Sequence, residues 1–292
     1  GIRDLVRSRG LGDVYKRQTT CFEMNDQIGG NWVYQDKTGH SSVFKTTHII
    51  SSKKFSEYTD FPMPDDYPDY PSGAELLAYF NSYVDTFNLK QYIRFNTKIK
   101  KAIPLDNKWK LFYEDSSKDF DYLIIANGHH WSPRIPTFEG EFSGELMHSH
   151  QFKNNEYFKD KSVLVVGGGN SACDIAVEVS RVAKKTSISM RRGYHFIPKF
   201  MMGMPSDVYY AKSLWIPQRL RLILQKLALR IVQGSYKDYG LQKPDHDILQ
   251  SHATINSELL YFIKHGKISP VSYTHLRAHE TVLDLVCRLL LE

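Results

Sequence analysis

KSVLVVGGGNSACDIAVEV, residues 161–179, is the stretch that decides the fold. Residues 163–166 form an uninterrupted apolar, largely β-branched run, which is typical of a parallel strand buried on both faces. Three glycines follow, and apolar residues then recur with the period of a helix from Ala172 to Val179. The stretch therefore predicts a strand, a tight glycine turn and a helix.

The glycine turn fits the G-x-G-x-x-G/A pattern of dinucleotide-binding proteins. Gly167 would make the turn, Gly169 would let the backbone approach a pyrophosphate, and Ala172 would let the helix pack close to the strand. The unpaired N–H groups at the helix N-terminus favour a bound phosphate. The alternative is a purely structural strand-turn-helix unit.

A second strand is predicted at residues 186–190, and it ends in Arg191 and Arg192. An acidic residue at this place would accept hydrogen bonds from a ribose 2′-hydroxyl, whereas a guanidinium pair suits a 2′-phosphate. The two arginines therefore favour NADP over NAD, unless they are simply solvated.

The bulk composition is that of a globular protein, and its positive net charge is compatible with an anionic partner. The 292 residues suggest about two domains, and the chain carries a net charge of +6. Because the basic residues are scattered, a phosphorylated cofactor is a better partner than nucleic acid. The three cysteines, Cys21, Cys173 and Cys287, form no CxxC, which disfavours a disulfide scaffold, a metal site and a dithiol centre.

No apolar run is long enough to span a membrane and no secretory signal is visible, so a cytoplasmic location is predicted. A basic amphipathic stretch at residues 214–232 could touch a membrane, but it more often packs as a helix with solvated arginines. Membrane contact is therefore not expected.

The N-terminal part carries a second set of candidate ligand-binding residues. Residues 19–23 predict a short strand ending in Glu23, the place of a ribose-binding acid, although no first strand with a glycine loop precedes it. Gly29 and Gly30 would allow a close backbone approach. Residues 120–126 predict a second buried parallel strand that ends in Asn127 and Gly128, where open α/β sheets bind ligands.

Other segments are predicted from turn residues and periodicity. They are irregular chain at 43–71, a helix at 73–87 capped by Ser72, antiparallel strands at 93–103 and 109–114, a linker between domains at 134–153 and a helix at 255–266.

Phe142, Gly144, His148 and Phe152 resemble the F-x-G-x-x-x-H-x-x-x-(Y/F) fingerprint of class B flavoprotein monooxygenases, placed just before the glycine turn. Together with CFE, IGGNW, DFPMP, IIANG, the GxGNSA turn and YGL-x-x-P-x-H, their order is similar to that of flavin-containing monooxygenases from Thr19 to Pro270.

This resemblance implies an α/β protein with two Rossmann-like dinucleotide-binding domains of the three-layer ββα/βαβ type, truncated, for FAD and NADPH. It implies an N,N-dimethylaniline monooxygenase-like enzyme that uses O2, through a C4a-hydroperoxyflavin, to oxygenate small N- or S-containing molecules. A homodimer is also allowed. Residues 19–158 would be a partial FAD domain and 159–270 the NADPH domain with a helical insert. Residues 1–18 and 271–292 resemble vector read-through, the alternative being a native arm and terminal helix.

The resemblance also implies roles for individual residues. Glu23 would hold the FAD ribose, and Gly29, Gly30 and Trp32 would line the flavin. Residues expected around NADPH are Gly167, Gly169, Asn170, Ser171 and Ala172 at the pyrophosphate, with Arg191 and Arg192 at the 2′-phosphate. His148 resembles the fingerprint histidine and is a candidate catalytic residue, although in the family this histidine couples the domains more than it performs chemistry. The alternative is a surface residue, as a lone histidine in a linker often is.

Three departures from the family pattern leave alternatives open. The first glycine clamp is missing ahead of Thr19, so the chain could be an NADP-binding fragment without turnover. Ile50 stands where many members have asparagine, which makes His48 a candidate catalytic substitute. The fingerprint ends in Phe152 and Lys153, which favours heteroatom oxygenation over Baeyer-Villiger oxygenation of ketones. A pyridine-nucleotide disulfide reductase would need a cysteine pair that the chain lacks.

Overall fold

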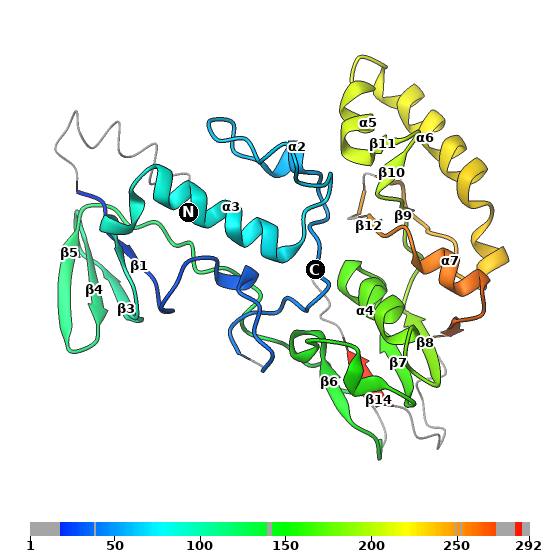
Figure 1. Cartoon of the computed structure of the whole chain (residues 1–292), viewed down its shortest axis with the longest axis horizontal. Coiled ribbons are helices and arrows are strands. Elements are labelled where there is room, and N and C mark those ends of the chain that lie inside the picture. Colours follow the sequence, from blue (N-terminus) through cyan, green and yellow to red (C-terminus); the bar gives the residue numbers. More distant parts are fainter. Residues whose placement is uncertain are drawn as a thin grey trace.

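The computed structural model describes residues 18–37, 39–138, 142–248, 250–251, 253–272 and 284–287. The N-terminal part, up to about residue 131, lies beside the C-terminal part that contains the glycine turn (Figure 1). The C-terminal part holds the parallel sheet, and the N-terminal part holds an antiparallel sheet and a long helix.

A five-stranded parallel sheet forms the centre of the C-terminal part, with the strand order β13-β8-β7-β14-β6. Its strands are β6 (Leu146–His148), β7 (Ser162–Val166), β8 (Lys185–Met190), β13 (Ile268–Ser272) and β14 (Asp284–Cys287). The predicted strands at 163–166 and 186–190 are confirmed, and the apolar run of β7 is buried. The mixed α/β architecture with a parallel sheet confirms the predicted fold class.

Helix α4 (Asn170–Ser180) covers this sheet, and it begins directly after the glycine turn. Ala172, Ile175, Ala176 and Val179, the residues with helical spacing in the sequence, are all buried in the same core cluster as β7. The predicted role of Ala172, which was to let the helix pack close to the strand, agrees with its burial. Burial of these side chains is what holds helix and sheet together.

The predicted linker at 134–153 is only partly a linker. Its end forms β6 at the edge of the sheet, followed by the short helices η3 (Ser149–Gln151) and η4 (Glu156–Phe158). Phe152 and Phe158 enter the core of the sheet. Apolar residues recur every few positions in this stretch, which is compatible with packing against the sheet. Polar residues between them make that pattern hard to recognise in the sequence.

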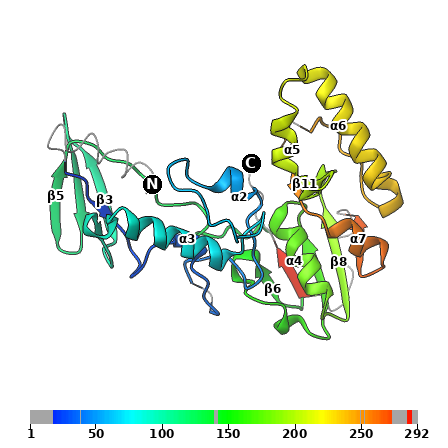
Figure 2. The same ribbon diagram turned by 45° about the horizontal axis from the view of Figure 1, so that its top comes forward.

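A group of smaller elements follows β8 (Figures 1 and 2). They are β9 (Phe196–Ile197), β10 (Phe200–Met201), β11 (Met204–Pro205), α5 (Ser206–Lys212), α6 (Gln218–Gln233), η5 (Tyr236–Tyr239), β12 (Thr254–Ile255) and α7 (Leu259–Lys264). The helix predicted at 255–266 is shorter, because Asn256 ends the strand and its side chain accepts hydrogen bonds from the N–H groups of Glu258 and Leu259.

The N-terminal part is built around α3 (Gly73–Thr86), which packs on its aromatic neighbours. Its other elements are β1 (Cys21–Phe22), η1 (Gly30–Trp32), α2 (Lys53–Ser56), η2 (Leu89–Tyr92), β2 (Ile93–Arg94), β3 (Ile99–Pro104), β4 (Trp109–Tyr113) and β5 (Ser116–Phe120). Strands β3 and β4 confirm the predicted antiparallel pair, and β5, which was not predicted, adds a third strand to it. The start of the first predicted strand is separate: it forms β2, which pairs in parallel with β1.

The parallel strand predicted at residues 120–126 is wrong. Strand β5 ends at Phe120, and residues 121–127 form no regular structure. Ile124 and Ile125 are 69% and 74% exposed. An apolar run becomes a buried parallel strand only when strands lie on both sides of it, and among the described residues no strand pairs with this segment.

Ser72 caps α3 as predicted, in a reciprocal arrangement. Its side chain accepts a hydrogen bond from the Glu75 N–H, while the Glu75 carboxylate accepts from the Ser72 N–H at 2.6 Å. We expect Ser72→Ala to lower the free energy of unfolding by about 1 kcal/mol, because one helix N–H loses its acceptor. Urea unfolding measures this loss, with Ser117→Ala, at an exposed position of β5, as the control.

The same cap gives a pH dependence. Hydrogen bonds from the Ser72 backbone and side chain lower the pKa of Glu75. The stability that this carboxylate contributes is therefore present above the ordinary pKa of a glutamate and is lost as the pH falls through the lowered pKa. The difference in unfolding free energy between wild type and Ser72→Ala should shrink in acid; an unchanged difference would contradict the cap.

The predicted terminal flanks stay a prediction. Residues 1–17, 273–283 and 288–292 lie outside the described residues, and β13 and β14 include residues 268–272 and 284–287.

Candidate dinucleotide-binding site

The glycine turn lies at the carboxyl end of β7, between two neighbouring strands. Gly167 has a φ of 134°, a conformation that a residue with a side chain rarely adopts, and its N–H donates to the Ser189 carbonyl of β8 at 2.8 Å. Gly169 is the residue before α4 and supplies no side-chain cap. The first N–H groups of α4 are therefore left for an acceptor outside the helix, as phosphate binding requires.

An aromatic ring fills the space next to the Cα atom of Gly168. A Cβ added to Gly168 would overlap the ring of Tyr194. Gly168→Ala should therefore lower the free energy of unfolding by about 1–3 kcal/mol, since the ring or the turn must move.

A second substitution tests the cause of that loss. Tyr194→Ala removes the ring, so the further effect of Gly168→Ala should be much smaller in the Tyr194→Ala background than in the wild type. Thermal unfolding of the four proteins measures the coupling; additive losses would show that Tyr194 does not restrict this position.

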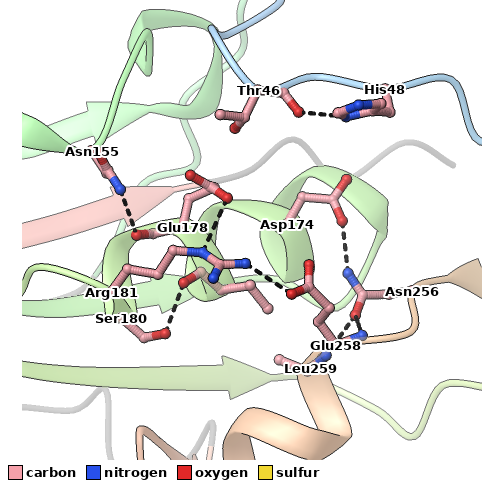
Figure 3. A network of polar contacts seen from close by, with 11 residues as sticks. Thr46, His48, Asn155, Asp174, Glu178, Ser180, Arg181, Asn256, Glu258 and Leu259 are labelled. Carbon is pink, nitrogen blue, oxygen red and sulfur yellow. Dashed lines mark hydrogen bonds and ion pairs between the residues drawn. The ribbon is translucent and has the colours of Figure 1, made fainter. Parts of the chain in front are cut away.

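Residues 254–256, called the strap below, form hydrogen bonds with the glycine turn and with the start of α4. The Thr254 hydroxyl donates to the Gly168 carbonyl at 2.7 Å, and the Ile255 N–H donates to the Asn170 side chain at 2.7 Å. The Asn256 side chain then donates to Asp174 of α4 (Figure 3). Asn170 was predicted to lie at the pyrophosphate, and its side-chain oxygen accepts the hydrogen bond from Ile255. No local pattern in the sequence predicts contacts between residues so far apart in the chain.

Arg191 and Arg192 follow β8 directly and are exposed. Because β7 and β8 are parallel neighbours, with Val166 opposite Ser189, both arginines lie at the edge of the sheet that carries the glycine turn. The guanidinium of Arg192 lies 5.6 Å from the centre of the Tyr194 ring, a cation–π contact. The same ring therefore contacts both the turn and one of the predicted phosphate ligands.

The carboxylate of Asp245 interacts with the charge of Arg192. A hydrogen bond with His246 is the main cause of a lowered pKa of Asp245, and the charge of Arg192 contributes to it. Asp245 and His246 belong to the YGL-x-x-P-x-H segment, which the structure brings near the arginines although the sequence separates them.

The predicted flavin-binding residues lie together in the N-terminal part, but several already have contacts. The Glu23 carboxylate accepts hydrogen bonds from the backbone and side-chain N–H groups of Asn25, both at 2.8 Å. A Cβ added to Gly29 would overlap Leu77, so this glycine allows α3 to approach. Trp32 packs in the cluster against α3, with its neighbour Asn31 bonded to Ser42.

Gly30 is the member of this group with open space. It has a φ of 49°, a Cβ added to it would meet no atom within 4 Å, and it lines a small hollow with Asn25, Asp26 and His40. Asn127 and Gly128 are exposed on the chain that follows β5, and a Cβ added to Gly128 would also lie in open space. Since the expected strand before them is absent, their placement at a sheet edge is not borne out.

The two predicted catalytic histidines are in different environments. His48 is exposed, contacts the Thr46 carbonyl through Nδ1 at 2.9 Å, and lies on a segment that faces Asp174 and Glu178 of α4 (Figure 3). His148 is buried at the end of β6, where its Nδ1 accepts from the His150 N–H at 3.0 Å. The exposed side chain of His48 is therefore accessible to a ligand. The buried side chain of His148 instead stabilises the turn that follows β6, by accepting the hydrogen bond from His150.

Two residues that were not predicted as site residues join the two parts of the molecule. The buried ammonium of Lys153 donates to the Ser41 carbonyl at 2.6 Å, and burial lowers the pKa of this lysine. Both ring nitrogens of His150 face carbonyl oxygens, those of His130 and Gly39. Their position in the sequence could have indicated this role, because His150 lies close to the fingerprint residue His148 and Lys153 directly follows Phe152.

The cysteine environments differ. Cys21 and Cys173 are in no disulfide, and the Cys173 thiol donates to the Gly168 carbonyl. Burial, followed by the charge of Glu23, raises the pKa of Cys21. No group of three or more metal-binding side chains is present in the described ranges. None of the helices in these ranges is long and apolar enough to cross a bilayer.

Comparison with known proteins shows which family shares this arrangement. A family model described as "Flavin-binding monooxygenase-like" matches residues 15–281. Human flavin-containing monooxygenase 5 is 35% identical over 263 residues, which cover 83% of this chain and 49% of the human protein. The chain thus spans about half the length of the curated relatives it matches.

Solved structures agree with this result. The S-allyl-L-cysteine S-oxygenase of Allium sativum is 26% identical, with a TM-score of 0.56 over 59% of this chain and 45% of that one. A structure described as OTEMO in complex with FAD and NADP has a TM-score of 0.69 over 95% of this chain and 67% of its own, at 15% identity, which is a likeness of fold alone.

Proposed function

Because this chain belongs to the flavin-binding monooxygenase-like family, we propose that it binds NADPH at the glycine turn and forms part of an NADPH- and FAD-dependent monooxygenase. The observation that carries the proposal is the uncapped N-terminus of α4 beside two exposed arginines at one edge of a parallel sheet. This pairing offers N–H donors to a pyrophosphate and guanidinium groups to a 2′-phosphate.

The residues around the turn fit the dinucleotide. Gly167 and Gly169 leave the backbone open toward a phosphate, and Asn170 and Ser171 begin the helix whose dipole favours negative charge. The strap holds Gly168 and Asn170, so the N–H groups are fixed before the ligand arrives. Fixed donors bind an anion better than mobile ones, because less entropy is lost on binding.

Fewer of the predicted FAD-binding residues are open to a ligand. Gly30 and its hollow remain open to a ligand, whereas Gly29 and the Glu23 carboxylate are engaged by Leu77 and Asn25. Glu23 still has a second carboxylate oxygen for a ribose hydroxyl. When bound, NADPH supplies a hydride and FAD activates O2 for transfer of one oxygen atom. The chain's own part is to hold the two cofactors and exclude water.

We propose small N- or S-containing molecules as substrates. The fingerprint ends in Phe152 and Lys153, and a relative with a similar fold at 26% identity is described as an S-oxygenase. His48 is the exposed side chain that we propose next to the substrate, where an imidazole can donate or accept a hydrogen bond. Baeyer-Villiger oxygenation is the second candidate. A cytoplasmic location and a homodimer remain predictions from the sequence.

The test is oxygenation by the purified chain and by a longer version that includes the remaining length of the relatives, each supplied with FAD and NADPH. A sulfide, a tertiary amine and a cyclic ketone are offered separately. The proposal expects sulfoxide or N-oxide as the main product of the longer version. A lactone as the main product would favour the second candidate, and NADPH binding with no flavin uptake by either version would contradict the oxygenase assignment.

A further inference from the structure

Residues 243–246 pack directly against the chain that follows the two arginines of the proposed NADPH site. Gly193 comes immediately after Arg192, and it is buried. A Cβ added to Gly193 would lie 2.5 Å from the main-chain carbonyl group of Lys243 and 2.5 Å from the main-chain nitrogen of Pro244. The two backbones therefore touch at this point, and the contact has room for a glycine but not for a side chain.

Two histidines hold this segment in place. The Nε2 atom of His195 donates to the His246 carbonyl at 2.7 Å, and the two rings meet edge to face with 5.2 Å between their centres. The Nδ1 atom of His246 in turn donates to the Asp245 carboxylate at 2.9 Å. One residue further on, Asp247 pairs with Lys226 of α6. Asp245 is therefore fixed at the edge of the sheet that carries the arginines.

This edge has charges of both signs. Arg191 and Arg192 are exposed, and the side chain of Asp245 is 81% exposed. The hydrogen bond with His246, and then the charge of Arg192, lower the pKa of Asp245, so its carboxylate is ionised at neutral pH. A phosphate monoester carries about two negative charges at this pH. Asp245 would therefore repel a 2′-phosphate held by the arginines, whereas it would not repel the 2′-hydroxyl of NADH.

We infer that Asp245 is a specificity-determining residue of the NADPH site, an inference that rests on the proposed function. Its carboxylate opposes the 2′-phosphate that Arg191 and Arg192 attract, and it thereby limits the preference for NADPH over NADH. The contact of Gly193 with residues 243–244 is what brings Asp245 to this edge. Because the carboxylate is exposed to water, its effect is moderate and is screened by salt.

The experiment is titration calorimetry of the 292-residue chain with adenosine 2′,5′-bisphosphate and with adenosine 5′-monophosphate, which differ only in the 2′-phosphate. Asp245→Asn should bind the bisphosphate about threefold more tightly than the wild type, and Asp245→Lys about tenfold, with a gain that shrinks as salt is added. Both variants should bind the monophosphate as the wild type does. A merely structural role for Asp245 would instead weaken the binding of both ligands.

Asp85→Asn is the matched control. It removes a carboxylate that is 59% exposed and paired with Lys90, at the end of α3 in the N-terminal part, so the net charge changes by the same amount as in Asp245→Asn. Its affinity for both ligands should equal that of the wild type. Circular dichroism checks that every variant is folded.

The outcomes separate this inference from the proposed function. The inference is overturned, and the NADPH site stands, if the wild type binds the bisphosphate but neither Asp245 variant binds it more tightly. An equal gain in Asp85→Asn also overturns it, because the effect would then come from net charge alone. If the folded wild type does not bind the bisphosphate, both the inference and the proposed NADPH site are overturned.

Discussion

Replacing Arg191 and Arg192 together by glutamine should weaken NADPH binding at least tenfold and leave NADH binding nearly unchanged. Both arginines follow the carboxyl end of β8, at the edge of the sheet that carries the glycine turn, where the 2′-phosphate of a bound NADPH would be placed. Each hydrogen bond between a charged donor and a charged acceptor contributes about 1.5–3 kcal/mol. NADH has a hydroxyl at this position, so it gains little from the arginines.

Titration calorimetry with the two coenzymes measures the change in selectivity. The matched control is Lys184→Gln with Lys185→Gln, which removes two exposed charges at the opposite end of β8. It should leave both affinities nearly as they are. Equal losses of NADPH and NADH affinity in the arginine variant would show that Arg191 and Arg192 do not bind the phosphate.

Phe152→Ala should lower the free energy of unfolding by about 3–5 kcal/mol, the cost of removing a large side chain from a packed core. Phe152 is 1% exposed and contacts Phe44 of the N-terminal part and Phe158, with ring centres 5.1 Å and 5.6 Å away. The cavity left by the ring would lie between the two parts of the molecule. Chemical denaturation measures the loss.

Phe142→Ala is the control from the same fingerprint, because Phe142 is 39% exposed. Its loss should be below about 1 kcal/mol, as for most exposed positions. Similar losses in the two variants would mean that Phe152 is not the core residue that the structure shows. NADPH binding by folded Phe152→Ala should persist, since the proposed ligands are the glycine turn before α4 and the arginines after β8.

The strand, turn and helix at residues 162–180 could be predicted because all of their determinants are local. The apolar run of β7, the positive φ of Gly167 and the helical spacing from Ala172 to Val179 each act within a few residues. The capping of α3 by Ser72 was predictable for the same reason.

Long-range contacts were the part that the sequence could not provide. The strap joins Thr254 to Gly168, and Lys153 joins the two parts through the Ser41 carbonyl. Neither contact leaves a periodic signal, because a single hydroxyl or ammonium group makes it. The strand prediction at residues 120–126 was wrong for a related reason. An apolar run indicates that a segment can be buried in a sheet, but it does not show whether neighbouring strands are present to pair with it.

The contacts around the glycines show how the predicted site residues could take part in binding. Asn170 was expected at the pyrophosphate, and its side-chain oxygen accepts a hydrogen bond from the Ile255 N–H. Its contribution to phosphate binding is then through its backbone N–H at the start of α4. In the N-terminal part, Gly29 serves the packing of Leu77, which leaves Gly30 as the more open position.

Titration of NADPH into the purified chain, followed by calorimetry, tests the central claim most directly. We expect saturable binding of one NADPH per chain, tighter than NADH, that is strongly weakened by Gly167→Val, because a β-branched residue cannot adopt the φ of 134° found there. Absence of NADPH binding by the folded chain, or unchanged binding by folded Gly167→Val, would contradict it.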